Sequence, residues 1–107
     1  MERILKLKAF IQKDPDDLFS RHALAMELLK LGEHLDAIRE MEELLKIDFR
    51  HTGTYLHLGR TYEKTGDTSQ ALSTYKRGLE VCRSVNARHD LQELMAAYQQ
   101  LEEELDG

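Results

Sequence analysis

The sequence repeats itself at a spacing of 34 residues across its central half. Leu24 aligns with Leu58, Gly32 with Gly66 and Ala37 with Ala71. Most of the remaining matches are also apolar, small or turn positions: Ala25 with Gly59, Leu28 with Tyr62, Lys30 with Lys64, Ile38 with Leu72, Met41 with Tyr75 and Leu45 with Leu79. A period of this length is typical of stacked units, each of which buries its apolar side against its neighbours. The chain is therefore predicted to contain one structural unit twice.

Each unit is predicted to be a helix, a turn and a second helix. Apolar residues recur at helical spacing on both sides of a glycine, with a predicted core stripe of Leu24, Leu28 and Leu31 before Gly32 and with Ala37, Ile38, Met41, Leu44 and Leu45 after it. The glycine can take the left-handed conformation that ends a helix, and Asp67 with Thr68 can cap the next one. Small residues are expected where the two helices cross closely: Ala25, Ala37, Gly59 and Ala71.

The same pattern extends to both ends of the chain. Continuing the period backwards places Ile4 on Ile38, Leu7 on Met41 and Ile11 on Leu45. A shift of two residues in register then places Leu91, Leu94, Met95 and Tyr98 on Tyr55, Leu58, Gly59 and Tyr62. Six helices are therefore predicted, over residues 2–13, 17–31, 34–46, 52–65, 68–84 and 88–105.

The second unit resembles the tetratricopeptide repeat family. It reads Tyr55-x-x-Leu58-Gly59-x-x-Tyr62, followed by Ala71 and Tyr75. The first unit matches more loosely, with Arg21 in the first aromatic slot and Leu28 in the tyrosine slot. The resemblance implies an all-α, right-handed α-α superhelix of the tetratricopeptide type. It also implies a single domain over 1–107, with a capping helix in 2–15, repeats at 18–51 and 52–85, and a second capping helix in 86–107.

The composition favours a packed helical protein. Hydrophobic residues make up 41% of the chain, which contains a single proline and has a formal net charge of -5. Net negative charge disfavours nucleic acid as a partner. The single cysteine cannot form an internal disulfide, and neither a signal peptide nor a membrane-spanning stretch is recognisable. A cytoplasmic location is therefore expected.

The sequence shows no apparatus for catalysis, and no metal or cofactor is expected. The five histidines offer no pair at the i, i+4 spacing that would place two on one helical face. Cys82 lies at an apolar helical position, where a lone cysteine usually acts as a small hydrophobe. The chain is thus predicted not to be an enzyme.

A role in binding proteins or peptides is expected instead. In solenoids of helix pairs, the first helices of successive repeats line a concave groove. By that resemblance, the predicted partner-binding groove comprises Phe19, His22, Met26, Leu29, Lys30, Leu56, Arg60, Glu63, Lys64, Gln92 and Gln99. The stripe of Phe19, His22, Met26 and Leu29 is equally consistent with an additional core face. A clamp for a terminal carboxylate is disfavoured, because the only asparagine is Asn86, outside the groove.

Two alternatives concern the terminal helices. The first is self-association, since residues 2–13 are basic and residues 88–107 acidic, and since the last helix carries a row of apolar residues: Leu91, Leu94, Met95, Tyr98, Leu101 and Leu105. The second is a membrane surface contact through Ile4, Leu7 and Ile11 with the neighbouring lysines. The 34-residue match assigns those three residues to the core, so no membrane partner is predicted.

Overall fold

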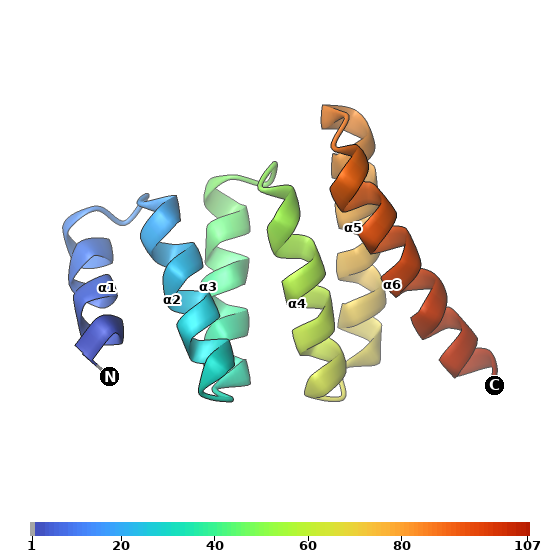
Figure 1. Ribbon diagram of the computed structural model, residues 1–107, viewed down its shortest axis with the longest axis horizontal. Helices are drawn as coiled ribbons and strands as arrows, with labels where there is room; N and C mark the ends of the chain where they lie inside the picture. Colours follow the sequence, from blue (N-terminus) through green and yellow to red (C-terminus); the bar gives the residue numbers. More distant parts are fainter. Residues whose placement is uncertain (1) are drawn as a thin grey trace. The chain divides into compact units, whose positions relative to one another are not determined.

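The computed structural model describes residues 2–107, and these residues fold into six α-helices without any strand (Figure 1). They are α1 (Glu2–Lys13), α2 (Leu18–Lys30), α3 (His34–Ile47), α4 (Thr52–Lys64), α5 (Thr68–Val85) and α6 (Arg88–Asp106). Every boundary lies within one residue of the prediction, so the all-α assignment and the six helices are confirmed. None of the six is both long enough and apolar enough to span a bilayer.

The described helices form two compact units. Residues 2–48 contain α1 to α3, and residues 49–107 contain α4 to α6. In the first unit α2 packs against both α1 and α3. In the second unit α5 packs against α4, and α6 lies against both of them (Figure 1).

The turn within each repeat is built on its glycine, as predicted. Gly32 and Gly66 have φ angles of 75° and 82°, which side chains with a Cβ rarely adopt. The amide of Gly32 donates to the carbonyl of Leu29, and the amide of Glu33 to the carbonyl of Leu28. The bonds after α4 follow the same pattern. These paired bonds are a Schellman motif, which satisfies the last carbonyls of the helix and reverses the chain.

Two helices begin at aspartates that accept backbone hydrogen bonds. The Asp67 carboxylate accepts from the amide of Gln70 at the start of α5, which confirms the predicted cap. At the start of α2, Asp17 accepts from the hydroxyl of Ser20 at 2.6 Å and from its amide at 3.1 Å. These bonds, the hydroxyl first, lower the pKa of Asp17 below its ordinary value. Both helix starts are therefore fixed locally by the sequence.

The predicted small residues lie at close helix crossings. Ala25, Ala37 and Ala71 are completely buried. A Cβ placed on Gly59 would come within 2.2 Å of the Tyr75 ring, so α4 and α5 approach one another through a position that admits only a hydrogen atom. The predicted core residue Leu31 is an exception, because its side chain is 57% exposed. It follows the last residue of α2, where the chain turns away from the packed face, so its assignment to the core was wrong.

Different side chains make the same hydrogen bond in the two repeats. The hydroxyl of Tyr55 donates to the carbonyl of Phe49 at 2.6 Å. In the first repeat Arg21 occupies the equivalent position, and its Nε donates to the carbonyl of Pro15 at 2.7 Å. The aromatic slot can therefore be filled by arginine, because the position requires a long side chain that donates to the connection preceding the helix.

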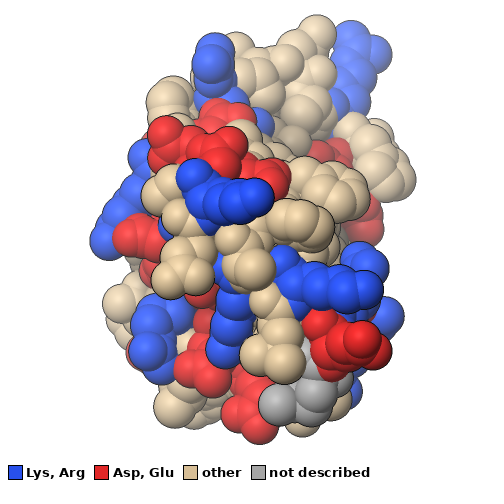
Figure 2. All heavy atoms as spheres, turned by 90° about the vertical axis from the view of Figure 1, so that its left-hand side faces the viewer, with Lys and Arg blue, Asp and Glu red and all other residues tan. Residues whose placement is uncertain are grey.

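Helix α1 packs against α2 in the first unit. Ile4 and Leu7 are buried and Ile11 is half-buried, as the repeat register predicts. Arg3 reaches Glu27 of α2 at 3.1 Å. Figure 2 views the molecule from the side of α1, and on that face the basic and acidic side chains are interspersed rather than gathered into one basic patch. Ile4, Leu7 and Ile11 therefore pack into the core of this unit.

Candidate functional site

The second unit contains a seam between α4 and α6, which run in the same general direction (Figure 1). At its start the hydroxyl of Thr52 donates to the carboxylate of Asp90. Two recesses follow along the same side, and Arg60 lines both of them. The α4–α6 seam is defined here by the residues that line these recesses: Thr52, Gly53, Leu56, His57, Arg60, Glu63, Lys64, Asp90, Glu93, Ala96, Ala97 and Gln100.

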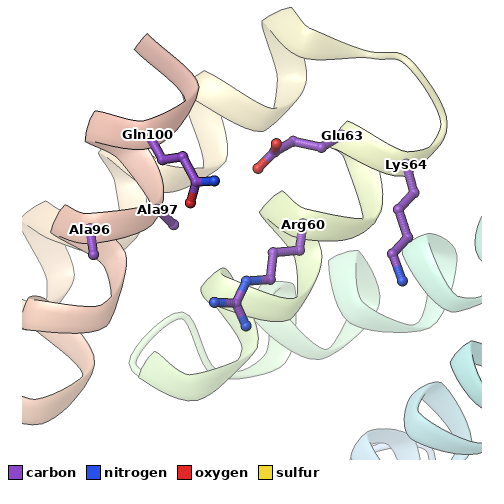
Figure 3. A pocket seen from close by; sticks show the side chains of 6 residues that line it. All are labelled: Arg60, Glu63, Lys64, Ala96, Ala97 and Gln100. Carbon is purple, nitrogen blue, oxygen red and sulfur yellow. The ribbon is translucent and has the colours of Figure 1, made fainter. Parts of the chain in front are cut away.

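The first recess, called the basic recess, has a volume of about 290 Å³. Arg60, Glu63 and Lys64 line it from α4, and Ala96, Ala97 and Gln100 from α6 (Figure 3). The small alanines leave the space open, while Glu63 and Gln100 point toward one another across it. Arg60 and Lys64 are exposed, and neither side chain forms an ion pair within residues 2–107. This recess therefore offers two available cations.

The carboxylate of Glu63, the third charged group of the basic recess, is hydrogen-bonded by a residue of α5. The hydroxyl of the buried Tyr75 donates to the carboxylate of Glu63. Burial, followed by this bond and the nearby Glu63 charge, raises the pKa of Tyr75 well above its ordinary value. Glu63 is consequently oriented by the core of the unit.

The raised pKa of Tyr75, caused first by burial and then by this bond, makes stability depend on pH in the alkaline range. Because the folded-state pKa of Tyr75 is raised, its contribution is present below the unfolded pKa of about 10 and is lost as the pH rises above that value. Urea unfolding at pH 8 and pH 11 should show a smaller alkaline loss in Tyr75→Phe than in the wild type. An equal loss in both proteins would contradict this assignment.

The second recess, called the acidic recess, has a volume of about 190 Å³. Thr52, Gly53, Leu56, His57 and Arg60 line it from α4, and Asp90 and Glu93 from α6. Asp90 lies in the first turn of α6, where a helix stabilises negative charge. The pKa of His57 is lowered mainly by burial and also by Arg60, with Glu93 opposing the shift. His57 is thus favoured in its neutral form, and the two carboxylates outnumber the single cation of this recess.

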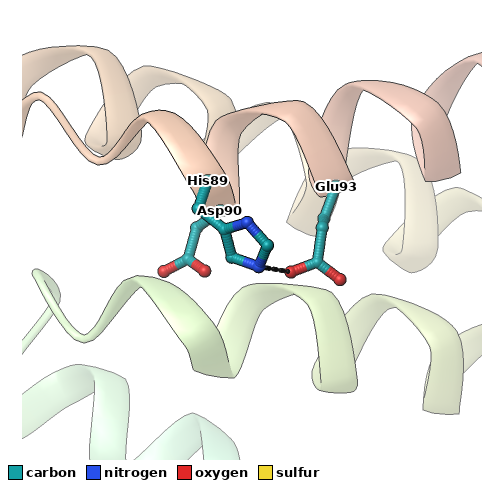
Figure 4. Close-up of side chains that lie close together, drawn as sticks. All are labelled: His89, Asp90 and Glu93. Atoms are coloured by element: carbon teal, nitrogen blue, oxygen red, sulfur yellow. Dashed lines mark ion pairs between the residues drawn. The ribbon is translucent and has the colours of Figure 1, made fainter.

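A group of side chains with metal-binding chemistry lies at the edge of the acidic recess. His89, Asp90 and Glu93 bring their ligand atoms within 4.8 Å of one another (Figure 4). His89 Nε2 lies 2.9 Å from a carboxylate oxygen of Glu93. This group was not predicted from the sequence, because it contains one histidine and two carboxylates rather than a pair of histidines. His89 and Glu93 are exposed, and one carboxylate oxygen of Glu93 pairs with His89, so their proximity is explained without an ion.

The structure brings together only part of the predicted groove in the second unit. Arg60, Glu63 and Lys64 share the basic recess. Leu56 lines the acidic recess, although it is only 8% exposed and also belongs to the core. Gln92 and Gln99 are exposed on α6 but line neither recess.

The predicted groove residues of the first unit form a partly buried face of α2. Phe19 is 79% exposed, whereas His22, Met26 and Leu29 are half-buried. Lys30 is exposed and lies 3.5 Å from a carboxylate oxygen of Glu27. Whether these five residues bind a partner stays a prediction.

Sequence reasoning missed the α6 side of both recesses. Glu93, Ala96 and Gln100 lie at helical spacing on one face of α6. Ala96 and Gln100 follow Arg60 and Lys64 by 36 residues, which is the register that the sequence analysis had already used for this helix. Applying that register to every α4 position, small residues included, would have found them.

Cys82 does not have the surroundings of a nucleophile. The side chain is fully buried in α5. Burial, and to a lesser degree Asp90, raises the pKa of its thiol. The thiol is therefore protonated at neutral pH, which suits the small hydrophobe that the sequence predicted.

Comparison with known proteins supports the family resemblance. A family model for the tetratricopeptide repeat matches residues 54–105. The crystal structure of a tetratricopeptide repeat domain protein from Salinibacter ruber is 42% identical in sequence, over 80% of this chain and 96% of that chain, with a TM-score of 0.76. A solution NMR structure from the same organism is 43% identical, over 83% and 90% of the two chains, with a TM-score of 0.77.

More distant structures share the fold. The TPR2B domain of yeast Sti1, solved as a complex with pHsp70, has a TM-score of 0.85 at 18% identity, over 94% of this chain and 81% of that chain. At this identity the likeness concerns the fold alone. No curated protein sequence matches the chain.

Proposed function

The chain belongs to the tetratricopeptide repeat family, and from that membership we propose that it is a protein-interaction module which binds a peptide segment along the α4–α6 seam. The observation that supports this proposal most strongly is that two recesses between α4 and α6 share the side chain of Arg60. Together they offer a strip of polar groups above small side chains. An extended peptide needs such a surface, since it requires close approach and dispersed polar contacts. A cytoplasmic location and a protein or peptide partner are part of this proposal.

Several polar groups of the seam are exposed or held in place before a partner arrives. The cations of the basic recess are exposed and form no ion pair with any residue from 2 to 107, so a partner does not have to break such a pair in order to reach them. Glu63 is fixed by Tyr75, and Asp90 by Thr52. Groups that are already held in place lose less entropy when they bind.

The proposal is tested by filling the basic recess. Ala96 is exposed, so Ala96→Arg should keep the fold while placing a long side chain into the space between α4 and α6. Peptides selected on the wild type from a random library should lose about tenfold or more in affinity for this variant, measured by fluorescence polarisation.

The matched control is Ser73→Arg. Ser73 is exposed on α5 and lines neither recess of the seam, and the substitution adds the same charge and bulk. Its affinity for the selected peptides should equal that of the wild type. Unchanged affinity in Ala96→Arg would place the binding surface elsewhere.

The alternative, self-association through the terminal helices, meets a steric obstacle at close range. In both complete repeats the crossing of the two helices uses a pair of small residues. At the equivalent positions the terminal helices carry Arg3 in α1 and Met95 in α6. Arg3 is engaged with Glu27, and Met95 is 39% exposed. A second copy that completed a repeat would place one of these long side chains where both repeats of this chain have a small one. Salt-sensitive association stays a prediction that light scattering can test.

A further inference from the structure

The two ends of the α4–α6 seam carry opposite charge. In the basic recess Arg60 and Lys64 face the single carboxylate of Glu63, while in the acidic recess Asp90 and Glu93 face the single guanidinium of Arg60. Arg60 belongs to both recesses, so the sign changes along one continuous strip. A uniformly acidic or uniformly basic partner would be attracted electrostatically at one end of this strip and repelled at the other.

From this arrangement we propose that the seam recognises an extended segment bearing one acidic and one basic side chain about three residues apart, which deepens the proposed function and rests on it. The acidic side chain pairs with Arg60 and Lys64, and the basic side chain pairs with Asp90 and Glu93. Such a partner is charge-complementary along its whole length, which favours correct encounter and fixes its direction.

The spacing follows from helix geometry. The acidic pair on α6 centres between residues 90 and 93, and the α6 positions opposite the basic pair are 96 to 100. About six to seven residues therefore separate the two centres, which corresponds to roughly 10 Å along a helix that rises 1.5 Å per residue. A segment in the extended polyproline II conformation rises about 3.1 Å per residue and has three residues per turn, so side chains three residues apart lie on one face and are separated by about 9 Å.

The other residues of the seam further restrict which segments can bind. Ala96 and Ala97 leave room for a backbone to approach α6, and Gln100 offers an amide that can donate to or accept from it. His57, which is favoured in its neutral form, adds no opposing charge to the acidic recess at neutral pH. The charged ends therefore select the segment, while the middle of the seam tolerates small residues.

The test uses four blocked peptides of nine residues that differ only at two positions three apart: Lys-x-x-Glu, Glu-x-x-Lys, Lys-x-x-Lys and Glu-x-x-Glu. At low salt one of the two mixed-charge orders should bind the full chain about fivefold more tightly than either like-charge peptide, as two exposed ion pairs allow. The difference should shrink as salt is added. Binding is measured by amide chemical shift titration, which also locates the site.

A charge-swapped variant supplies the decisive comparison. Lys64 and Glu93 are both exposed, so Lys64→Glu combined with Glu93→Lys should keep the fold and the net charge while reversing the charge at each end of the seam. This variant should prefer the opposite order of the mixed-charge peptides. An unchanged preference, equal binding of like-charge peptides, or no binding of any of the four would overturn the inference. The selected-library test with Ala96→Arg decides the proposed function separately, so the two ideas fail in distinguishable ways.

Discussion

Replacing Leu94 with alanine should lower the free energy of unfolding by about 3 kcal/mol, which is typical of a fully buried leucine in a close-packed core. Leu94 is completely buried and is one of two buried residues of α6, the other being Leu101. Its side chain reaches α5, because a Cβ added to Gly78 would come within 2.9 Å of a Leu94 methyl group. Truncation therefore leaves a cavity at the point where α6 is anchored.

The measurement is urea unfolding followed by far-ultraviolet circular dichroism. Met95→Ala is the matched control, since it shortens the adjacent and exposed side chain on the same helix. It should change the free energy of unfolding by less than about 0.5 kcal/mol. Similar losses in both variants would show that Leu94 does not anchor α6.

Replacing Gly59 with alanine should also destabilise the protein, by about 2 kcal/mol, because overpacking a filled core forces its neighbours to move. The added Cβ would lie 2.2 Å from Cε1 and 2.6 Å from Cδ1 of Tyr75. This ring cannot swing aside freely, since it is buried and its hydroxyl is held by Glu63. The steric cost outweighs the gain of about 1 kcal/mol that alanine ordinarily brings to a helix interior.

Gly53→Ala separates the steric term from helix propensity. Gly53 lies in the same helix, and a Cβ at this position would meet nothing within 4 Å. This control should be neutral or slightly more stable than the wild type in the same urea experiment. A Gly59→Ala variant that gains stability would show that α4 and α5 do not cross closely at this residue.

The fold could be predicted from the sequence because its determinants are local and repeated. Gly32 and Gly66 mark the turns, and the left-handed conformation they supply is what ends the first helix of each repeat. Gly59 and Ala71 mark the close crossing. Each feature depends on the chemistry of one or two residues, and its recurrence after 34 positions distinguishes it from chance.

The exact surface was harder to predict, because exposure depends on where the neighbouring helix lies. Leu31 continues the helical apolar pattern but lies beyond the last residue of α2, where that pattern no longer applies. Ala96 and Ala97 carry no charge or hydrogen-bonding group, so nothing in their side chains suggested a site. They matter because their small size leaves the basic recess open.

One comparison within α2 and α4 illustrates the same limit. Leu56 was predicted as a groove residue, while Met26 was left open between groove and core; in the structure Met26 is half-buried and Leu56 is buried. Helical periodicity shows that such residues share a face. It cannot show how much of that face a neighbouring helix covers.

The most direct test of the account maps a selected peptide onto the chain by amide chemical shifts. The largest changes should fall on both walls of the basic recess, at Arg60 and Lys64 of α4 and at Ala96 and Gln100 of α6. Changes concentrated on the outer face of α5, or confined to residues 2–48, would contradict the assignment of binding to the α4–α6 seam.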